Sequence, residues 1–192
     1  MKIVAFSGSA RKDGNTAFLV GKVFEELKKE GIGTELVQLA GKKIRGCIAC
    51  FRCFENRDRR CNVRDDDVNA CIEKMDQADG IILASPVYFA TVSSEIKALM
   101  DRTGLVAIAN DHMFARKVGA AVVAVRRGGA VTTFDSINRF FFINQMVVPG
   151  SSYWNFAFGL NPGEVEGDEE GMQTMRNLGG NMAWLMKKIH GA

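Results

Sequence analysis

The chain has 192 residues and a formal net charge of +3, with 47% hydrophobic residues, 24% charged residues and three prolines. This composition is typical of a globular protein and excludes long disordered stretches. We therefore expect residues 1–192 to form a single domain that buries a core between a sheet and two layers of helices.

The apolar run near the N-terminus, residues 3–6, is too short for the core of a signal peptide, and no run in the sequence approaches membrane-spanning length. We therefore expect a cytoplasmic protein. Because thiols stay reduced in the cytoplasm, the five cysteines are interpreted as metal ligands or redox groups rather than as disulfides.

Hydrophobic spacing predicts the elements of the first half of the chain. Residues 2–6 are predicted to be a buried strand, followed by a polar, glycine-rich turn over residues 7–15. The next helix ends at Gly31 and has its apolar residues at i, i+3, i+4 and i+7, namely Val20, Val23, Phe24 and Leu27. A second strand is expected over residues 34–39. A helix starting at residues 65–67 should bury Cys71, which indicates a structural cysteine.

The second half of the chain continues this alternation. Strands are predicted over residues 80–84 and 118–125, with a short fifth strand over residues 146–148. Helices are expected after Ser93 or Ser94, after the turn at 126–129, and from about residue 169 to 189.

Apolar strands that alternate with amphipathic helices predict an α/β fold, a doubly wound five-stranded parallel sheet with helices on both faces. Ligands of such sheets bind beyond the carboxyl ends of the strands, where the strand order switches. The loops 7–16, 85–92 and 125–132 should therefore converge on one site. Two segments are additional to this minimal sheet-and-helix arrangement: a cysteine-rich insertion at about residues 41–65, and a long aromatic-rich connection over residues 150–167.

The first of these loops, residues 7–16, has the features of an anion site. Amides at the start of the following helix, the hydroxyls of Ser9 and Thr16, and the guanidinium of Arg11 can surround a phosphate. The residue after Gly14 is Asn15, and neither the dinucleotide glycine fingerprint nor the lysine of an ATP-binding loop is present. A monophosphate such as that of FMN is favoured over NAD or ATP; the simpler alternative is a tight turn of small polar residues.

The other two loops offer a place for a flat ring. Apolar and aromatic residues follow the third strand, namely Pro86, Val87, Tyr88 and Phe89. After the fourth strand, Gly128 and Gly129 let the backbone approach a ligand closely.

With these motifs the chain resembles the NADPH-dependent FMN reductase-like flavoproteins, and within them the iron-sulfur flavoproteins. The resemblance rests on residues 8–16, on residues 85–89 with 97–102, and on the cysteine cluster. It implies a flavodoxin-like fold in which Ser9, Arg11, Asn15 and Thr16 hold the FMN phosphate. It also implies that residues 86–89 and Gly128-Gly129 pack beside the isoalloxazine, and that a homodimer or homotetramer has its flavin near a subunit interface.

Cys47, Cys50, Cys53 and Cys61 form the pattern C-x2-C-x2-C-x7-C. Three thiols in series on one turning loop, closed by a fourth, are typical of a 4Fe-4S cluster. Four thiolates also suit zinc, but zinc sites usually pair two C-x2-C units. Free thiols or a redox disulfide are the remaining alternatives.

Basic residues outnumber Glu55 and Asp58 between Lys42 and Arg64. This stretch is either a solvated loop or a surface that offsets an anionic cofactor and docks an acidic electron carrier. Nucleic acid is disfavoured, because Phe51 and Phe54 are the only aromatic residues in the stretch.

The function expected from these features is flavin redox chemistry, for which no catalytic side chain is required. The main hypothesis is an iron-sulfur flavoprotein that passes electrons from a ferredoxin-like donor through a 4Fe-4S cluster to FMN and an acceptor. One alternative is a cluster-free, NAD(P)H-dependent FMN or quinone reductase. The other is a non-enzymatic flavin- or zinc-binding module that senses redox state.

Overall fold

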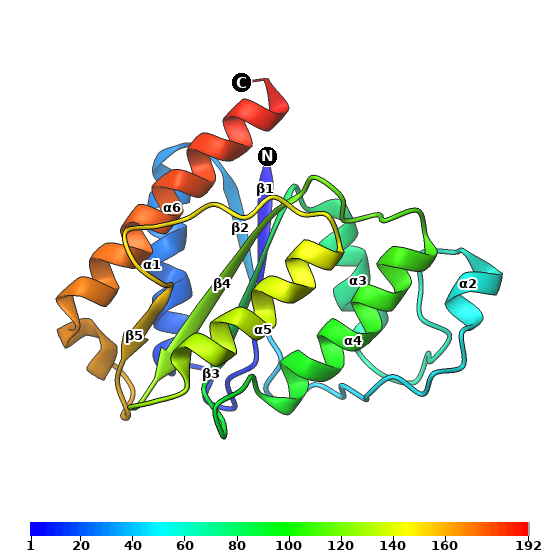
Figure 1. The fold of residues 1–192 in the computed structure, drawn as a ribbon, viewed down its shortest axis with the longest axis horizontal. Coiled ribbons are helices and arrows are strands. Elements are labelled where there is room, and N and C mark those ends of the chain that lie inside the picture. The colour runs from blue at the N-terminus through cyan, green and yellow to red at the C-terminus, as the bar shows by residue number, and fades with distance from the viewer. Residues whose placement is uncertain (192) are drawn as a thin grey trace.

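The structure of the chain is a computed structural model that describes residues 1–191. Its centre is a parallel sheet with the strand order β2-β1-β3-β4-β5 (Figure 1). The strands are β1 (Lys2–Ser7), β2 (Gly33–Gln38), β3 (Gly80–Pro86), β4 (Val118–Val125) and β5 (Phe156–Phe158). The order switches direction at β1, because β2 lies on one side of it and every later strand lies on the other. This arrangement confirms the predicted doubly wound, flavodoxin-like sheet.

Helices cover both faces of the sheet (Figure 1). One face carries α1 (Asn15–Lys29) and α6 (Glu169–His190), and the other carries α3 (Val68–Gln77), α4 (Ser94–Ala109) and α5 (Ala130–Ile143). Successive residues of β1 serve opposite cores: Val4 and Phe6 pack with α3, α4 and α5, whereas Ile3 and Ala5 pack with α1 and α6. Both faces of the strand are buried, which is why its sequence is apolar without alternation.

Capping side chains place two helix starts. The Ser93 hydroxyl accepts a hydrogen bond from the amide of Ile96 at 3.4 Å, so Ser93 is the residue that caps α4. Asp168 caps α6 by accepting from the amide of Gly171 at 2.9 Å. Asp168 itself follows a single 3-10 turn, η1 (Glu164–Gly167).

The prediction of the fifth strand was wrong. Residues 146–148 form only an isolated bridge at the start of β4, in which Val147 pairs with Val118. Pro149, which has no amide hydrogen, follows directly and cannot extend that pairing. The fifth strand is β5 instead, which pairs with the other end of β4, Phe156 opposite Val123.

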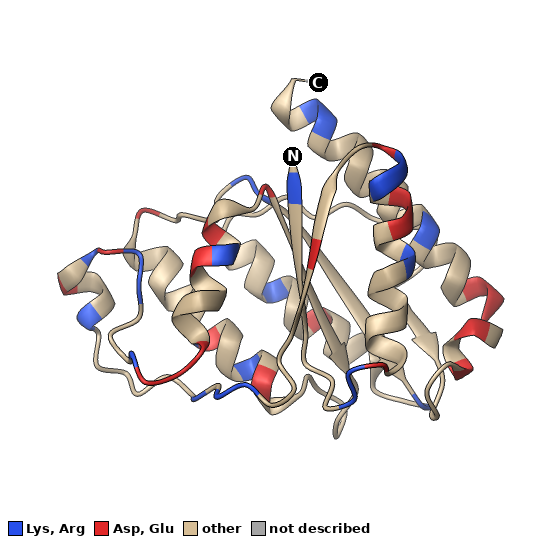
Figure 2. Ribbon diagram, turned by 180° about the vertical axis from the view of Figure 1, so that it is seen from behind, with Lys and Arg blue, Asp and Glu red and all other residues tan. Residues whose placement is uncertain are grey.

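Residues 41–67, which we call the cysteine segment, connect the region of β2 to α3 and contain the unpredicted five-residue helix α2 (Arg52–Asn56). Figures 1 and 2 show α2 at the end of the molecule farthest from β5 and the start of α6. The basic residues of the cysteine segment largely pair with acids of the same chain: Lys43 and Arg45 with Asp65, Arg59 with Asp76, Arg60 with Glu73, and Arg64 with Asp58. The expected excess of positive charge is thereby largely neutralised.

None of the helices within residues 1–191 is long and apolar enough to cross a membrane.

Candidate functional site

A hollow of about 160 Å³ lies at the carboxyl edge of the sheet, where the turns after β1, β3, β4 and β5 meet. Of the residues predicted to bind the cofactor, those that line it are Ser9, Arg11, Asn15, Thr16, Pro86, Val87 and Tyr88. Segments far apart in the sequence thus converge at the switch point of the strand order, as the topology requires.

The turn after β1 presents the start of α1 to this hollow. Ser9 accepts a hydrogen bond from the amide of Arg11 at 3.1 Å, and the amide of Gly14 donates to the carbonyl of Arg11 at 3.2 Å. The capping residue of α1 is Gly14, which has no side chain to bond to the first amides, and the first turn of α1 contains no acidic residue. The first amides of α1 and the positive end of its dipole therefore face the hollow uncompensated, which suits a phosphate.

Gly8 allows this turn to lie directly on α4. A Cβ atom at Gly8 would lie 2.3 Å from Cγ1 of Ile96 and 2.4 Å from Oγ of Ser93. The amide of Gly8 donates to the carbonyl of Ala84 at 2.9 Å, which ties the turn after β1 to the end of β3. The position therefore requires glycine because of close approach.

Asn15, at the start of α1, holds the connection that follows β5. Its Oδ1 accepts a hydrogen bond from the amide of Gly163 at 2.9 Å, and the residue is 8% exposed. Only its amide NH2 group remains for a ligand, so Asn15 acts on the site mainly by holding the wall formed by Gly159 and Leu160. Thr16, by contrast, lies beneath the hollow with its side chain buried.

The turn after β3 is tight and strained. Backbone hydrogen bonds join Tyr88 and Thr91 in both directions, so Phe89 and Ala90 occupy the two central positions with φ of 49° and 59°. Such a turn normally takes glycine or asparagine. Tyr88 lines the hollow, whereas the side chain of Phe89 is fully exposed at the tip and does not line it.

The two glycines after β4 do not line the hollow either. Gly129 has φ of +86° and supports the neighbouring turn, because a Cβ atom there would lie 2.6 Å from Cα of Ala90. Gly128 has open space around it within the described residues.

Sequence reasoning did not include five residues that line the hollow, namely Gly14, Ala124, Arg126, Gly159 and Leu160. Arg126 directly follows β4, so the rule that ligands bind at strand ends could have identified it. Gly159 and Leu160 follow β5, and misplacing the fifth strand concealed them.

The hollow suits FMN in its chemistry and, together with its neighbour, in its size. By itself it is smaller than the roughly 300–1,000 Å³ that encloses a whole ligand. It adjoins a second hollow of about 520 Å³, which shares Arg126, Gly159 and Leu160 with it and includes Arg127. Among the ion pairs of the described chain, neither Arg126 nor Arg127 takes part in one. The phosphate would lie at the start of α1 and the ring beside Tyr88.

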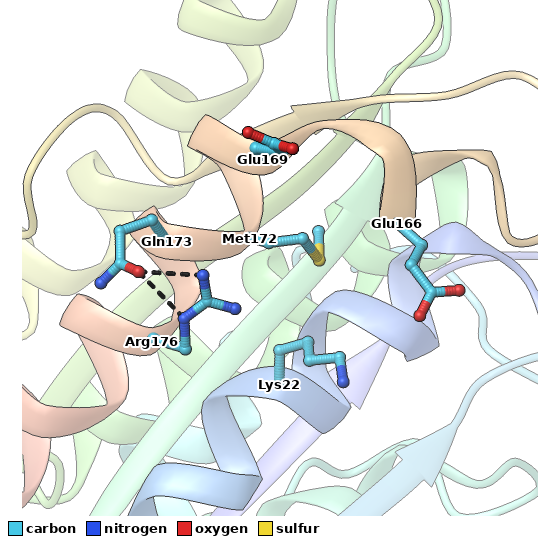
Figure 3. Close-up of a pocket in the computed structure, with 6 residues that line it drawn as sticks. All are labelled: Lys22, Glu166, Glu169, Met172, Gln173 and Arg176. Atoms are coloured by element: carbon cyan, nitrogen blue, oxygen red, sulfur yellow. Dashed lines mark hydrogen bonds between the residues drawn. The ribbon is translucent and has the colours of Figure 1, made fainter.

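A separate hollow of about 480 Å³ lies between α1 and α6 (Figure 3). Arg176 bonds to Gln173 there, and Lys22 forms an ion pair with Glu25. Glu166 and Glu169 add carboxylates, so cations and anions are mixed, and none of its lining residues comes from a strand end. We assign no role to this hollow.

The four predicted metal ligands differ in exposure. Cys47 and Cys50 are exposed, Cys61 is half-buried, and Cys53 in α2 is buried in the core beside α4. Burial raises the pKa of Cys53, and the neighbouring charges of Cys61 and Cys50 raise it further. The fifth cysteine, Cys71, is buried in α3 as predicted, and burial raises its pKa to about 11.

The thiols fit an iron-sulfur cluster as a set of donors, but they do not form a closed site. Three of them lie near enough for their charges to interact, as the pKa of Cys53 shows. Within residues 1–191, however, no group of three or more His, Cys, Asp or Glu side chains is placed to hold a metal ion. A bound cluster would require the segment to close around it.

Comparison with known proteins places this chain among flavoproteins. The sequence model of the family described as NADPH-dependent FMN reductase matches residues 1–161. The chain is 41% identical to the iron-sulfur flavoprotein MJ1083 of Methanocaldococcus jannaschii, over 98% of this chain and 99% of that protein. It is 38% identical to an iron-sulfur flavoprotein of Methanosarcina thermophila, over 98% and 97% of the two chains.

Solved structures show the same fold at low sequence identity. RosB, crystallised with 8-demethyl-8-formylriboflavin-5'-phosphate, superposes with a TM-score of 0.73 at 17% identity over 100% of this chain and 81% of its own. A WrbA-like flavodoxin from Agrobacterium tumefaciens gives a TM-score of 0.66 at 14% identity over 97% of each chain. Both comparisons support the flavodoxin-like arrangement.

Proposed function

This chain belongs to the NADPH-dependent FMN reductase family of FMN-binding, flavin-dependent oxidoreductases, and on that premise we propose that it is an iron-sulfur flavoprotein. In this role it takes electrons from a ferredoxin-like donor and passes them to an acceptor through a 4Fe-4S cluster and FMN. Such a cluster exchanges single electrons, whereas FMN can take up one or two. The protein itself supplies position and electrostatics.

One observation carries this proposal. The chain combines the FMN-type hollow with four cysteines in a cluster-type spacing, and the relatives that match it over almost their whole length are named iron-sulfur flavoproteins. A reductase that used FMN alone would not need three thiols within seven residues.

We further propose a cytoplasmic homodimer or homotetramer with the flavin near a subunit interface. Large apolar side chains are exposed in the turn after β3 and on and just before β5, namely Tyr88, Phe89, Tyr153, Trp154 and Phe158. Exposed apolar patches of this kind usually mark contact surfaces. Sedimentation at micromolar concentration would test the assembly, and a monomer that persists with FMN bound would contradict it.

The electron-transfer role is tested on protein purified without oxygen. We expect bound FMN, about four iron atoms per chain, and an electron paramagnetic resonance signal when reduced ferredoxin is added. A colourless protein that does not bind added FMN would contradict the flavin assignment. FMN-bound protein that lacks iron and gives no signal would contradict the cluster.

The alternative function is an NAD(P)H-dependent FMN or quinone reductase. The unpaired Arg126 and Arg127 beside the hollow favour it, because they could bind the phosphates of a pyridine nucleotide. Over 77 residues, 39% of this chain, the sequence is also 34% identical to an NAD(P)H dehydrogenase (quinone) of Acidithiobacillus ferrooxidans. Rapid anaerobic bleaching of the flavin by NADPH or NADH would support this function, and its absence with both would exclude it.

A further inference from the structure

Arg102 on α4 is a buried cation. It is 1% exposed, and its side chain and that of Asp66 are both 0% exposed where they form an ion pair. Arginine is rarely buried to this extent, because taking a charge out of water is costly unless every donor finds a partner. Burial lowers the pKa of Arg102, but hydrogen bonds to Asp66 and Cys61 outweigh this and raise it.

Every hydrogen-bond partner of this guanidinium lies in the cysteine segment. Nε donates to Sγ of Cys61 at 3.3 Å, and Nη2 donates to the carbonyl of Val63 at 3.2 Å. Nη1 donates to the carboxylate of Asp66 and, at 3.2 Å, to the carbonyl of Arg45. One side chain of α4 therefore joins both ends of the segment that carries the four thiols.

The cysteine segment has little regular secondary structure, so side-chain contacts largely set its shape. Most of its residues are exposed, and its only helix, α2, has five residues. Four residues other than glycine adopt positive φ within it, namely Ala49, Phe51, Arg57 and Arg59. Backbone of this kind persists only where surrounding contacts impose it. Within residues 1–191, three side chains outside the segment bond to its backbone: Arg102, Asn69 of α3 at Cys61 and Val63, and Asn110 at the end of α4, which accepts from the amide of Arg59. Of these three, only Arg102 carries a charge and bonds to a cysteine sulfur.

We propose that Arg102 is a positioning residue that shapes the cysteine segment and fixes the sulfur of Cys61 before any metal binds. Because Asp66 balances its charge, the donor on Nε is free to orient the sulfur. Cys61 is then held against α4, as the buried Cys53 is, whereas Cys47 and Cys50 lie on the exposed part of the segment. A donor that orients a ligand in this way also tunes the bound metal centre. The proposal rests on the proposed function only for the use made of the thiols.

The test compares three proteins with the wild type in metal-free form. The double variant D66N/R102Q removes both buried charges, so that neither is left unpaired. R102K keeps a cation beside Asp66 but cannot reach all four partners. The control K97Q/D101N removes an exposed ion pair from the same helix, where Lys97 bonds to Asp101 at 2.5 Å.

In D66N/R102Q we expect amide hydrogen exchange across residues 45–66 to accelerate by about tenfold or more, with β1, β3 and β4 unchanged. Alkylation of Cys61 should accelerate by a similar factor, and that of the buried Cys71 should not. R102K should keep slow exchange near Asp66 yet lose the slow alkylation of Cys61. The control should match the wild type throughout.

Wild-type alkylation of Cys61 in both R102K and D66N/R102Q would overturn the proposal. If the double variant does not fold, R102K decides by the same measurements. In the metal-loaded protein, a lower iron content of R102K than of the control would add support. So would altered g-values in the electron paramagnetic resonance signal of the iron that R102K retains. If the wild type never binds iron but the exchange and alkylation changes occur, the cluster proposal fails and the role of Arg102 stands.

Discussion

Nη1 of Arg11 donates a hydrogen bond to the carbonyl of Leu160 at 2.9 Å, across 149 positions of sequence. The guanidinium therefore spans from the turn after β1 to the turn after β5, over the mouth of the hollow. Its remaining N–H groups are left to face an anion at the start of α1. This contact gives the hollow a wall from the distant end of the fold.

Arg11 should contribute to FMN affinity far more than its neighbour Lys12. Replacing Arg11 with alanine removes charge-assisted hydrogen bonds to the phosphate, so we expect affinity to fall by about 1.5–3 kcal/mol, roughly 10- to 150-fold. Fluorescence titration of the apoprotein with FMN measures this. K12A is the matched control, because Lys12 is exposed on the same turn but does not line the hollow. Equal losses in the two variants would contradict the assignment.

Gly8 should tolerate no side chain. Because a Cβ atom there would lie 2.3 Å from Ile96, G8A should destabilise the fold by about 1–3 kcal/mol and weaken FMN binding. The control is G21A in α1, where a Cβ atom has no neighbour within 4 Å in the described chain. That change should stabilise the helix by up to about 1 kcal/mol. Urea unfolding measures both, and a G8A protein as stable as the wild type would show that the turn can move off α4.

Cys71 should resist alkylation in the folded protein, unlike Cys47 and Cys50. Its pKa is raised from 9.0 to about 11, so at pH 8 very little thiolate exists, and the group is buried. The stability linked to this shift is present below pH 9 and is lost as pH rises towards 11. Iodoacetamide labelling followed by mass spectrometry provides the measurement, with urea-unfolded protein as the control. Native labelling of Cys71 at the rate of Cys47 would refute the buried placement.

Glu35 should link stability to acid pH. It bonds to Lys2 at 2.7 Å and to Lys74 at 2.5 Å, and these bonds lower its pKa from 4.5. Its contribution is therefore complete above pH 4.5 and is lost as pH falls through the lowered value. The E35Q variant should be less stable than the wild type at pH 7, and the gap should narrow below pH 4.

Urea midpoints measured from pH 3 to pH 7 test this dependence. E25Q, which removes one exposed ion pair on α1, is the control. A gap between E35Q and the wild type that stays constant with pH would rule out the link.

The sequence by itself determined the first four strands and the five long helices in their order, because buried strands and amphipathic helices have distinct hydrophobic periods that local residues satisfy. It also located the turn around Ser9 and Arg11, since glycine and small polar residues between a strand and a helix mark a turn without reference to the rest of the fold. The sequence likewise placed the start of α3 near residues 65–67, although it did not predict that Asp65 pairs with Lys43 and Arg45. These features depend on neighbours along the chain.

Only the tertiary structure decided which short apolar segment became the fifth strand and where Arg102 points. Residues 146–148 and β5 are equally short and apolar, and pairing with different ends of β4 separates them. Arg102 sits among helical residues where a solvated charge is the ordinary expectation, yet it is buried because its partners arrive from residues 45–66. In both cases the deciding free energy comes from contacts between distant segments, which no local pattern encodes.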